Sequence, residues 1–281
     1  MKSSTEIIKA AESLKKGELV AFPTETVYGL GADATSDQAV ATLFAVKGRP
    51  RFNPLISHIG DAQAAFALGA FSEDAKKLAL AFWPGPLTVV VPRAAKCPVS
   101  LLASAGLPSI ALRVPDHPLA LELLRAVGRP VVAPSANLSG RVSPTTAAHV
   151  KRGLGKKVSV ILDGGPCTVG VESTVISFMN ERPTLLRPGG LSRGEIEQVL
   201  GHDLDVEADS AQPHSPGQME SHYAPHAQLR LEATSPRKGE SYLGFGSNSH
   251  GPYTLSEHGD VIEAAANLFH MLHELDGLGV K

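Results

Sequence analysis

The sequence predicts an α/β fold in which helices flank an open, twisted, mixed sheet. Helical and strand patterns alternate along most of the chain, which is typical of a sheet covered by helices. The strands expected between Val158 and Pro188 follow one another like hairpins, which argues against a purely parallel sheet. The 281 residues suffice for one large domain and a smaller second one.

The first half of the chain alternates short helices and strands. Apolar residues at helical spacing from Ile7 predict a helix that stops at Gly17, and GELVAF predicts the strand that follows. A PTET turn and a glycine-punctuated loop come next, and Ser36 or Asp37 caps a helix to about Val46. LISHI predicts a short strand, and the alanine-rich segments 61–70 and 73–82 predict helices that end at WPGP.

The second half continues the alternation with stronger strand signals. β-branched residues predict the strands LTVVVP and SIALRVP, and RPVVAPSAN predicts a strand that enters a polar loop. Helices are expected at 117–127, 145–154 and 192–200, the last capped by Ser192. VSVILDGG, ESTVISF and PTLLRPG predict three more strands.

The composition changes near residue 201, which divides the predicted larger domain, 1–203, from the rest. Residues 204–227 are polar, contain proline and lack periodicity, as linkers do. In 228–281, QLRLEA and YLGFG predict two strands and 260–275 predicts a helix, so this region is expected to be a small, partial α/β domain.

Charge and cysteine content narrow the class of protein. A formal net charge of −2 does not fit a dedicated nucleic-acid-binding domain, although a local basic groove remains compatible with it. The two cysteines, Cys97 and Cys167, make neither a disulfide framework nor a four-ligand zinc site. The sequence shows neither a secretory leader pattern nor a membrane-length apolar run, so a soluble cytoplasmic protein is expected.

Two histidines are candidate metal ligands. His270 and His273 lie three apart on the helix expected at 260–275 and could share an ion. Without a third ligand, a solvated helical face is the better interpretation, and no metal site is expected.

A basic loop is the first candidate for binding chemistry. If the loop after the second helix is extended, Lys47, Arg49 and Arg51 converge on one surface, near the hydroxyls of Thr24 and Thr26. Such a patch suits a polyanion such as a nucleoside triphosphate. The phosphate-binding G-x-x-x-x-G-K-[ST] motif and the third glycine of a dinucleotide loop are both absent.

Further polar side chains follow the ends of several predicted strands. Arg113 stands within an otherwise apolar strand, where a charge must be paired or reach a cavity. The members of this set are Lys47, Arg49, Arg51, Asn53, Ser109, Arg113, Ser135, Asn137, Ser143, Ser173 and Arg187. Surface ion pairs would explain any one of them, whereas the whole set predicts an anion-binding cleft. Tyr223 in the linker could fold over a bound base, since stacking on a base contributes about 1–3 kcal/mol.

At these residues the chain resembles the YrdC family in its long form, the threonylcarbamoyl-AMP synthases. PTETVYGLG, KGRP with NPL, SIALRVP, PSAN, ESTV, LRPG and SPGQMESHYAP occur in the order found in that family. The resemblance implies a YrdC-like open twisted sheet with a deep basic cavity, a linker that closes over it, and a small Rossmann-like C-terminal domain. This chain departs from the family motif at QMES, and its C-terminal region is short for the family.

The resemblance also implies a reaction. L-threonine, bicarbonate and ATP would give threonylcarbamoyl-AMP and pyrophosphate, with Mg²⁺ bound mainly through the ATP phosphates. The product would pass to a threonylcarbamoyl transferase complex that modifies tRNA, and weak tRNA binding would be compatible with this.

Family roles can be assigned to matching positions of this chain. L-threonine would be held by Thr26, His58, Arg113, Ser173 and the backbone at Ala133, with Arg113 on the carboxylate. ATP would be held by Arg49, Asn53, Ser109, Ser135, Ser143, Arg187 and Tyr223. Lys47 and Arg49 would be the catalytic cations.

Three other functions stay open at this point. An RNA-binding module of the same fold would use the basic loop without catalysis. A carbamoyl-adenylate enzyme like the related domain of hydrogenase maturation proteins would need cysteine-rich zinc modules, which two cysteines cannot build. A paralogue acting on another amino acid is not distinguished by the sequence.

Overall fold

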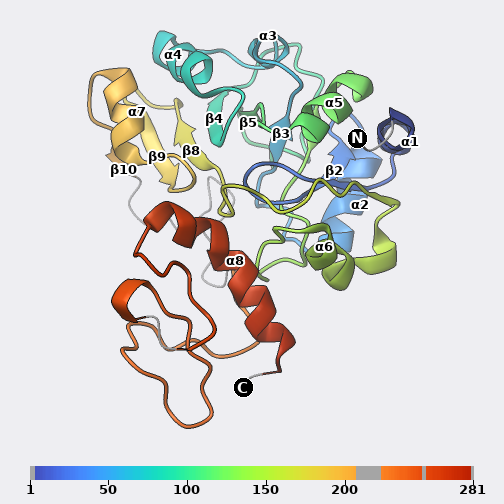
Figure 1. Ribbon diagram of the computed structural model, residues 1–281. Helices are drawn as coiled ribbons and strands as arrows, with labels where there is room; N and C mark the ends of the chain where they lie inside the picture. The colour runs from blue at the N-terminus through green and yellow to red at the C-terminus, as the bar shows by residue number, and fades with distance from the viewer. Residues whose placement is uncertain (1–3, 207–222, 249–250, 280–281) are drawn as a thin grey trace.

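The computed structural model describes residues 4–206, 223–248 and 251–279 (Figure 1). Within them, ten strands form one sheet in the order β10-β9-β8-β4-β5-β3-β6-β2-β1-β7. These strands are β1 (Val20–Phe22), β2 (Gly29–Asp33), β3 (Ile56–His58), β4 (Leu87–Pro92), β5 (Ser109–Arg113), β6 (Val131–Val132), β7 (Val160–Ile161), β8 (Thr174–Ser177), β9 (Thr184–Arg187) and β10 (Asp205–Val206). Parallel and antiparallel pairs both occur, so the predicted mixed α/β sheet is confirmed.

Helices cover both faces of the sheet. They are α1 (Ser4–Lys15), α2 (Asp37–Lys47), α3 (Ala62–Phe66), α4 (Glu73–Phe82), α5 (Pro118–Val127), α6 (Ala147–Gly153), α7 (Arg193–Leu200) and α8 (Val261–Gly277). Along β1, Phe22 packs with α1 and α5, whereas Ala21 packs in the core that contains α2 and α4. Neighbouring strand residues point to opposite faces, so the two apolar clusters lie on either side of the sheet.

Local capping explains where several helices begin. The Ser36 side chain accepts the Ala39 N–H at the start of α2, as the sequence predicted. Ser192 forms a reciprocal capping box with Glu195 at the start of α7. Each cap satisfies backbone donors that the first helical turn leaves without partners.

The glycine-punctuated loop of the prediction is in fact strand β2. Gly29 and Gly31 allow this strand to pack closely against its neighbours: a Cβ at Gly31 would lie 2.9 Å from the Phe22 ring. The glycines that suggested a loop therefore mark a close approach within the sheet.

The two strands expected in 228–246 do not form, whereas the predicted C-terminal helix is α8. Among the described residues, a single bridge, between Gly244 and Thr254, forms in that region. Leu229 and Leu231 are 57% and 79% exposed, and they border a cavity of about 440 Å³ beside α8. Strand-like sequence needs neighbouring strands to pair with, and the described residues supply none here.

The predicted linker lies largely outside the described residues. Residues 205–206 belong to the sheet as β10, and residues 223–227 lead toward α8. The boundaries at 203 and 227 therefore stay predictions. None of the helices described is both long and apolar enough to cross a membrane.

Candidate active site

A polar cavity of about 30 Å³ lies where the ends of β3, β5 and β9 meet the loops that follow β1, α2 and β6. Its lining residues are Thr24, Val27, Gly29, Arg49, Ile56, His58, Arg113, Ala133, Pro134, Ser135, Glu172 and Arg187. Six of the thirteen residues assigned to threonine, ATP or catalysis are in that set, which brings together loops that are far apart in the sequence. The other predicted site residues lie behind the cavity wall or farther away.

His58 and Arg113 are neighbours because of strand register. They are paired positions at the ends of the parallel strands β3 and β5. His58 is 3% exposed, and burial, together with the Arg113 charge, lowers the pKa of its imidazole to about 3. His58 Nδ1 has no hydrogen-bond partner among the described residues. The site therefore presents a neutral imidazole beside a guanidinium.

The charge of Arg113 was expected either to be paired or to reach a cavity, and the structure shows both. Its Nη2 donates to Glu25 Oε1 at 2.7 Å, and both side chains are buried. Glu25 Oε2 accepts the Asp116 N–H at 2.9 Å, and Arg113 Nε donates to the Gly85 carbonyl at 3.4 Å. Sequence reasoning missed Glu25, although a buried arginine requires an acid and the PTET turn supplies one.

Arg187 is held by the segment that precedes β8. Its Nε and Nη2 donate to the Ser173 carbonyl at 3.1 and 2.9 Å, and Nη2 also donates to Ser173 Oγ at 3.0 Å. Glu172 lies 3.8 Å from Arg187 and accepts a hydrogen bond from Ser143 Oγ at 2.9 Å. Ser143 and Ser173 thus support the lining groups Glu172 and Arg187. Glu172 is a second acid that sequence reasoning left unassigned within ESTV.

Three cations do not converge on one surface as the extended-loop prediction required. Gly48 ends α2 in a left-handed turn, and Arg51 is exposed while Lys47 and Arg49 are buried. Arg49 Nη2 donates to the Pro54 carbonyl at 3.0 Å and Nε to the Asn53 carbonyl at 3.3 Å. Burial lowers the pKa of Arg49 to about 10, and Glu172 opposes this shift.

Lys47 supports the cavity wall and is not one of its lining residues. Its amino group donates to the backbone carbonyls of Ser135 and Asn137, at 2.5 Å for Asn137. Burial, followed by the charge of Arg49, lowers its pKa to about 7. The geometry favours a positioning role for Lys47 on the PSAN loop, and its catalytic role stays a prediction.

The remaining predicted residues lie at different distances from the cavity. Thr26 is fully buried, and its hydroxyl lies 2.8 Å from that of Thr24, which lines the wall. Asn53 is fully buried beside Arg49. Ser109, at the start of β5, borders a separate small cavity with Ser57. Four residues of an extended strand span about 13 Å, so Ser109 lies well away from Arg113.

Tyr223 connects the cavity to α8. Its ring stacks on Phe269 with centroids 5.1 Å apart, and it joins an apolar cluster that includes Val27 and Val142. Burial and the Glu172 charge raise the pKa of its hydroxyl, and a hydrogen bond with Arg187 opposes the shift. Tyr223 therefore stands at the edge of the arginine-lined wall.

The histidines of α8 do not form the solvated face that the sequence suggested. His270 and His273 both stack on His149 of α6, with centroids 5.5 and 4.0 Å away. The helix packs against the catalytic region there, which spacing along one helix could not reveal.

Basic groups outnumber acids around the cavity. The basic side chains are Lys47, Arg49, Arg113 and Arg187, and the acids are Glu25 and Glu172. In a cavity with little water this excess attracts anions strongly. Guanidinium groups such as those of Arg49, Arg113 and Arg187 are suited to pair with carboxylates and phosphates.

Comparisons with known proteins identify the family. A family model described as "Telomere recombination" (Sua5_yciO_yrdC) matches residues 12–189, and one described as "Threonylcarbamoyl-AMP synthase, C-terminal domain" matches residues 191–281. The threonylcarbamoyl-AMP synthase of Bacillus subtilis is 48% identical over 240 residues, covering 83% of this chain and 68% of its own. That of Pyrococcus abyssi is 41% identical, covering 96% and 85%.

Solved structures give the same result. The crystal structure of P. abyssi Sua5 complexed with L-threonine has a TM-score of 0.88 and 40% identity, covering 98% of this chain and 86% of its own. E. coli YciO, at 24% identity and a TM-score of 0.60, shares the fold. The chain therefore belongs to the threonylcarbamoyl-AMP synthase family, in the long form known as Sua5, and with it to the nucleotidyltransferases.

Proposed function

We propose that this chain makes threonylcarbamoyl-AMP from L-threonine, bicarbonate and ATP, with release of pyrophosphate. The observation that carries the proposal is the cavity in which neutral His58, Arg113, Arg49 and Arg187 meet. The names of the relatives and the threonine complex of a 40% identical structure support the choice of substrates.

The amino acid would bind at the ends of β3 and β5. Arg113 pairs with the threonine carboxylate while keeping Glu25 on its other side. His58 Nδ1 and the backbone at Ala133 bind the polar groups of the substrate, and both residues line the cavity. Thr26 and Ser173 act from behind this wall, through Thr24 and Arg187.

The nucleotide would bind along the arginine-lined wall. Arg49 and Arg187 hold the phosphates, since guanidinium groups match phosphate oxygens in geometry. Ser135, Asn53 and Ser143 assist, and Ser109 reaches a distant part of the nucleotide. Tyr223 closes the edge of the site and offers its ring to the base.

Positioning and charge stabilisation account for the chemistry. The neutral amine of threonine attacks the carbon of CO2 and gives up a proton to form a carbamate; when bicarbonate is the source, a C–O bond breaks and water leaves. A carbamate oxygen then attacks the α-phosphorus of ATP. The bond from the α-phosphorus to the bridging oxygen breaks, and pyrophosphate leaves. Arg49 and Arg187 reduce the repulsion between the anionic carbamate and the triphosphate. No covalent enzyme nucleophile is needed.

A Mg²⁺ ion fits this site as a companion of ATP. Glu25 and Glu172 both already accept hydrogen bonds, from Arg113 and Ser143 respectively, so the wall offers no cage of uncommitted carboxylates. The ion would be held mainly by phosphate oxygens, with Glu172 the nearest protein carboxylate to that wall. When bound, it neutralises phosphate charge.

The product is a reactive mixed anhydride, so a consuming enzyme must take it up soon after release. We assign that step to a threonylcarbamoyl transferase complex acting on tRNA, with at most weak tRNA binding by this chain. The proposal places the enzyme in the cytoplasm, where ATP and tRNA are available.

Pyrophosphate release from ATP tests the proposal, measured with and without threonine and bicarbonate. We expect release to require both, and Arg113→Gln to raise the threonine concentration that is needed at least tenfold. The matched control is Arg182→Gln, because Arg182 is exposed and pairs with Asp205 away from the cavity. Pyrophosphate release that does not depend on threonine, or does not depend on bicarbonate, would contradict the assignment. An unchanged threonine requirement in Arg113→Gln would also contradict it.

A further inference from the structure

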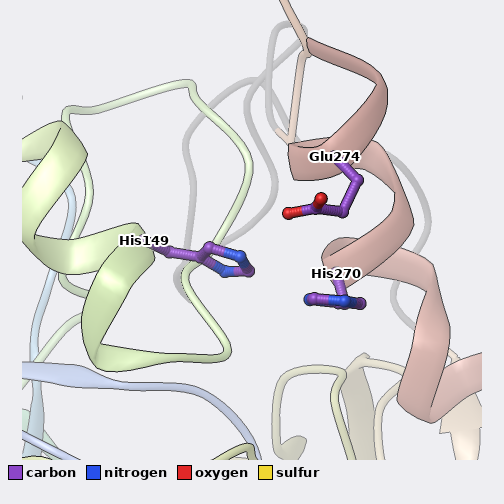
Figure 2. A group of neighbouring side chains, drawn as sticks. All are labelled: His149, His270 and Glu274. Carbon is purple, nitrogen blue, oxygen red and sulfur yellow. The ribbon is translucent and has the colours of Figure 1, made fainter. Parts of the chain in front are cut away.

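Three metal-binding side chains from two helices converge outside the active site. His149 lies on α6, and His270 and Glu274 lie on α8 (Figure 2). One ligand atom from each lies within 4.8 Å of the others. In Figure 2 the His149 ring points across the gap between the helices, and the Glu274 carboxylate points back toward it.

The helix geometry explains why the two α8 residues act together. His270 and Glu274 are four apart, so they occupy adjacent turns on one face of α8. The stacked His149 and His270 rings, 24° from parallel, are contributed by elements more than a hundred residues apart in the chain. Packing of α8 on α6, and not local sequence, builds the group.

One nitrogen of His149 is available for a ligand. Nδ1 accepts the Thr145 backbone N–H at 3.3 Å and lies 3.5 Å from the Thr145 hydroxyl, so the proton of the neutral ring is on Nε2 in this structure. A metal that binds Nε2 displaces this proton to Nδ1, where the Thr145 hydroxyl accepts it in place of the contact with the Thr145 N–H. His149 is 4% exposed, so its ring belongs to the packed contact between the two helices.

His273 supports this group without joining it. Its Nε2 lies 3.2 Å from the Ser143 carbonyl, so that nitrogen donates to the backbone, and its ring stacks on His149. This contact restrains the orientation of the His149 ring. His273 also ties α8 to the loop that carries Ser143.

We propose that His149, His270 and Glu274 bind a divalent transition metal of the zinc class, with water as fourth ligand. Two imidazoles and one carboxylate are a known donor set for Zn²⁺, whereas Mg²⁺ and Ca²⁺ prefer oxygen donors only. The ion would fasten α8 to α6. It would thereby stabilise the contact between the C-terminal helix and the loop around Ser143.

Arg152 competes with the metal for Glu274. Its guanidinium lies 3.9 Å from Glu274 Oε1, and both side chains are about half exposed. An exposed pair of this kind contributes little, so an ion can displace it. Removing Arg152 should therefore tighten metal binding, whereas a purely structural role for the histidines predicts no such effect.

Zinc titration of the full-length, chelator-treated protein tests the proposal, with calorimetry for binding and thermal unfolding for stability. We expect one Zn²⁺ per chain, and a rise in Tm of roughly 5–10 °C at a hundredfold excess over Kd. His270→Asn and Glu274→Gln should each weaken binding at least tenfold, and Thr145→Val about tenfold. Arg152→Gln should strengthen it.

The control and the folding check use exposed residues. His258→Asn, which changes an exposed histidine elsewhere, should bind zinc like the original chain. His270→Asn changes a partly exposed side chain and so tests the site even if His149 variants fail to fold. Equal zinc affinity in the original chain, His270→Asn and Glu274→Gln would overturn the proposal, as would less than half an ion per chain.

Discussion

The buried pair Arg113–Glu25 offers a quantitative test of how the site is held. The 2.7 Å contact joins two side chains that are 3% and 7% exposed, and Glu25 also accepts the Asp116 N–H. Removing one partner leaves the other charge buried without compensation, which costs about 3–5 kcal/mol. Glu25→Gln and Arg113→Gln should each lower the free energy of unfolding by that amount.

The double variant should recover much of the loss. With both charges gone, two amides of similar shape face each other and no uncompensated charge stays buried. We expect the loss in Glu25→Gln/Arg113→Gln to fall short of the summed single losses by at least about 2 kcal/mol. Urea unfolding followed by circular dichroism measures all four proteins.

The partly exposed pair Arg129–Asp33 provides the comparison. Its contact is also 2.7 Å, but the Arg129 side chain is 41% exposed, whereas the Asp33 side chain is 4% exposed. Its coupling free energy should be about 1 kcal/mol or less, because solvent screens the charges. Additive losses in the Arg113–Glu25 cycle, within about 0.5 kcal/mol, would refute the argument that burial makes the pair interdependent.

Three further predictions follow from single residues. Between pH 6.5 and the folded pKa of about 3, His58 binds a proton in the unfolded chain but not in the folded one. Acidification from pH 7 to pH 5 should therefore lower the free energy of unfolding by about 2 kcal/mol more in the original chain than in His58→Gln. Urea unfolding at both pH values measures this difference, and an equal loss in the two proteins would contradict it. Gly29→Ala places a Cβ 3.0 Å from Ala133 Cβ at the cavity wall and should weaken threonine binding about tenfold by calorimetry, whereas Gly194→Ala, in open space on α7, should leave the affinity unchanged. Ser192→Ala should cost about 1 kcal/mol of stability through the lost cap without changing pyrophosphate release, and an unchanged Tm would count against the cap.

Local sequence patterns predicted the elements whose causes are local. Ser36 and Ser192 cap helices where expected, and the β-branched runs of β4 and β5 form central strands. The same reasoning failed at β2, because Gly29 and Gly31 serve close packing against residues distant in sequence. It also failed for 228–246, where strand-like residues lack neighbouring strands in the described part of the chain.

In the candidate site, too, features with local causes could be predicted and features that depend on distant contacts could not. Arg113 stood out in the sequence because a charge in an apolar strand needs an explanation, and the structure places it in the cavity. Its partner Glu25 could not be identified from sequence spacing, because the contact spans 88 positions. Likewise, Lys47 looks like a phosphate ligand in KGRP, yet its amino group binds two backbone carbonyls of the PSAN loop.

The group formed by His149, His270 and Glu274 shows what the spacing along one helix leaves out. On the helix alone, His270 and His273 had no third ligand, and a solvated face was the reasonable interpretation. The third member of the group lies on α6, and the cluster of Val27, Val142, Phe269 and Leu272 packs α8 against the same part of the molecule. The apolar contact that holds Tyr223 beside the arginines therefore also helps to hold α8 near α6. A change that loosens this contact, such as Phe269→Ala, should weaken zinc binding and the ordering of the substrate site together.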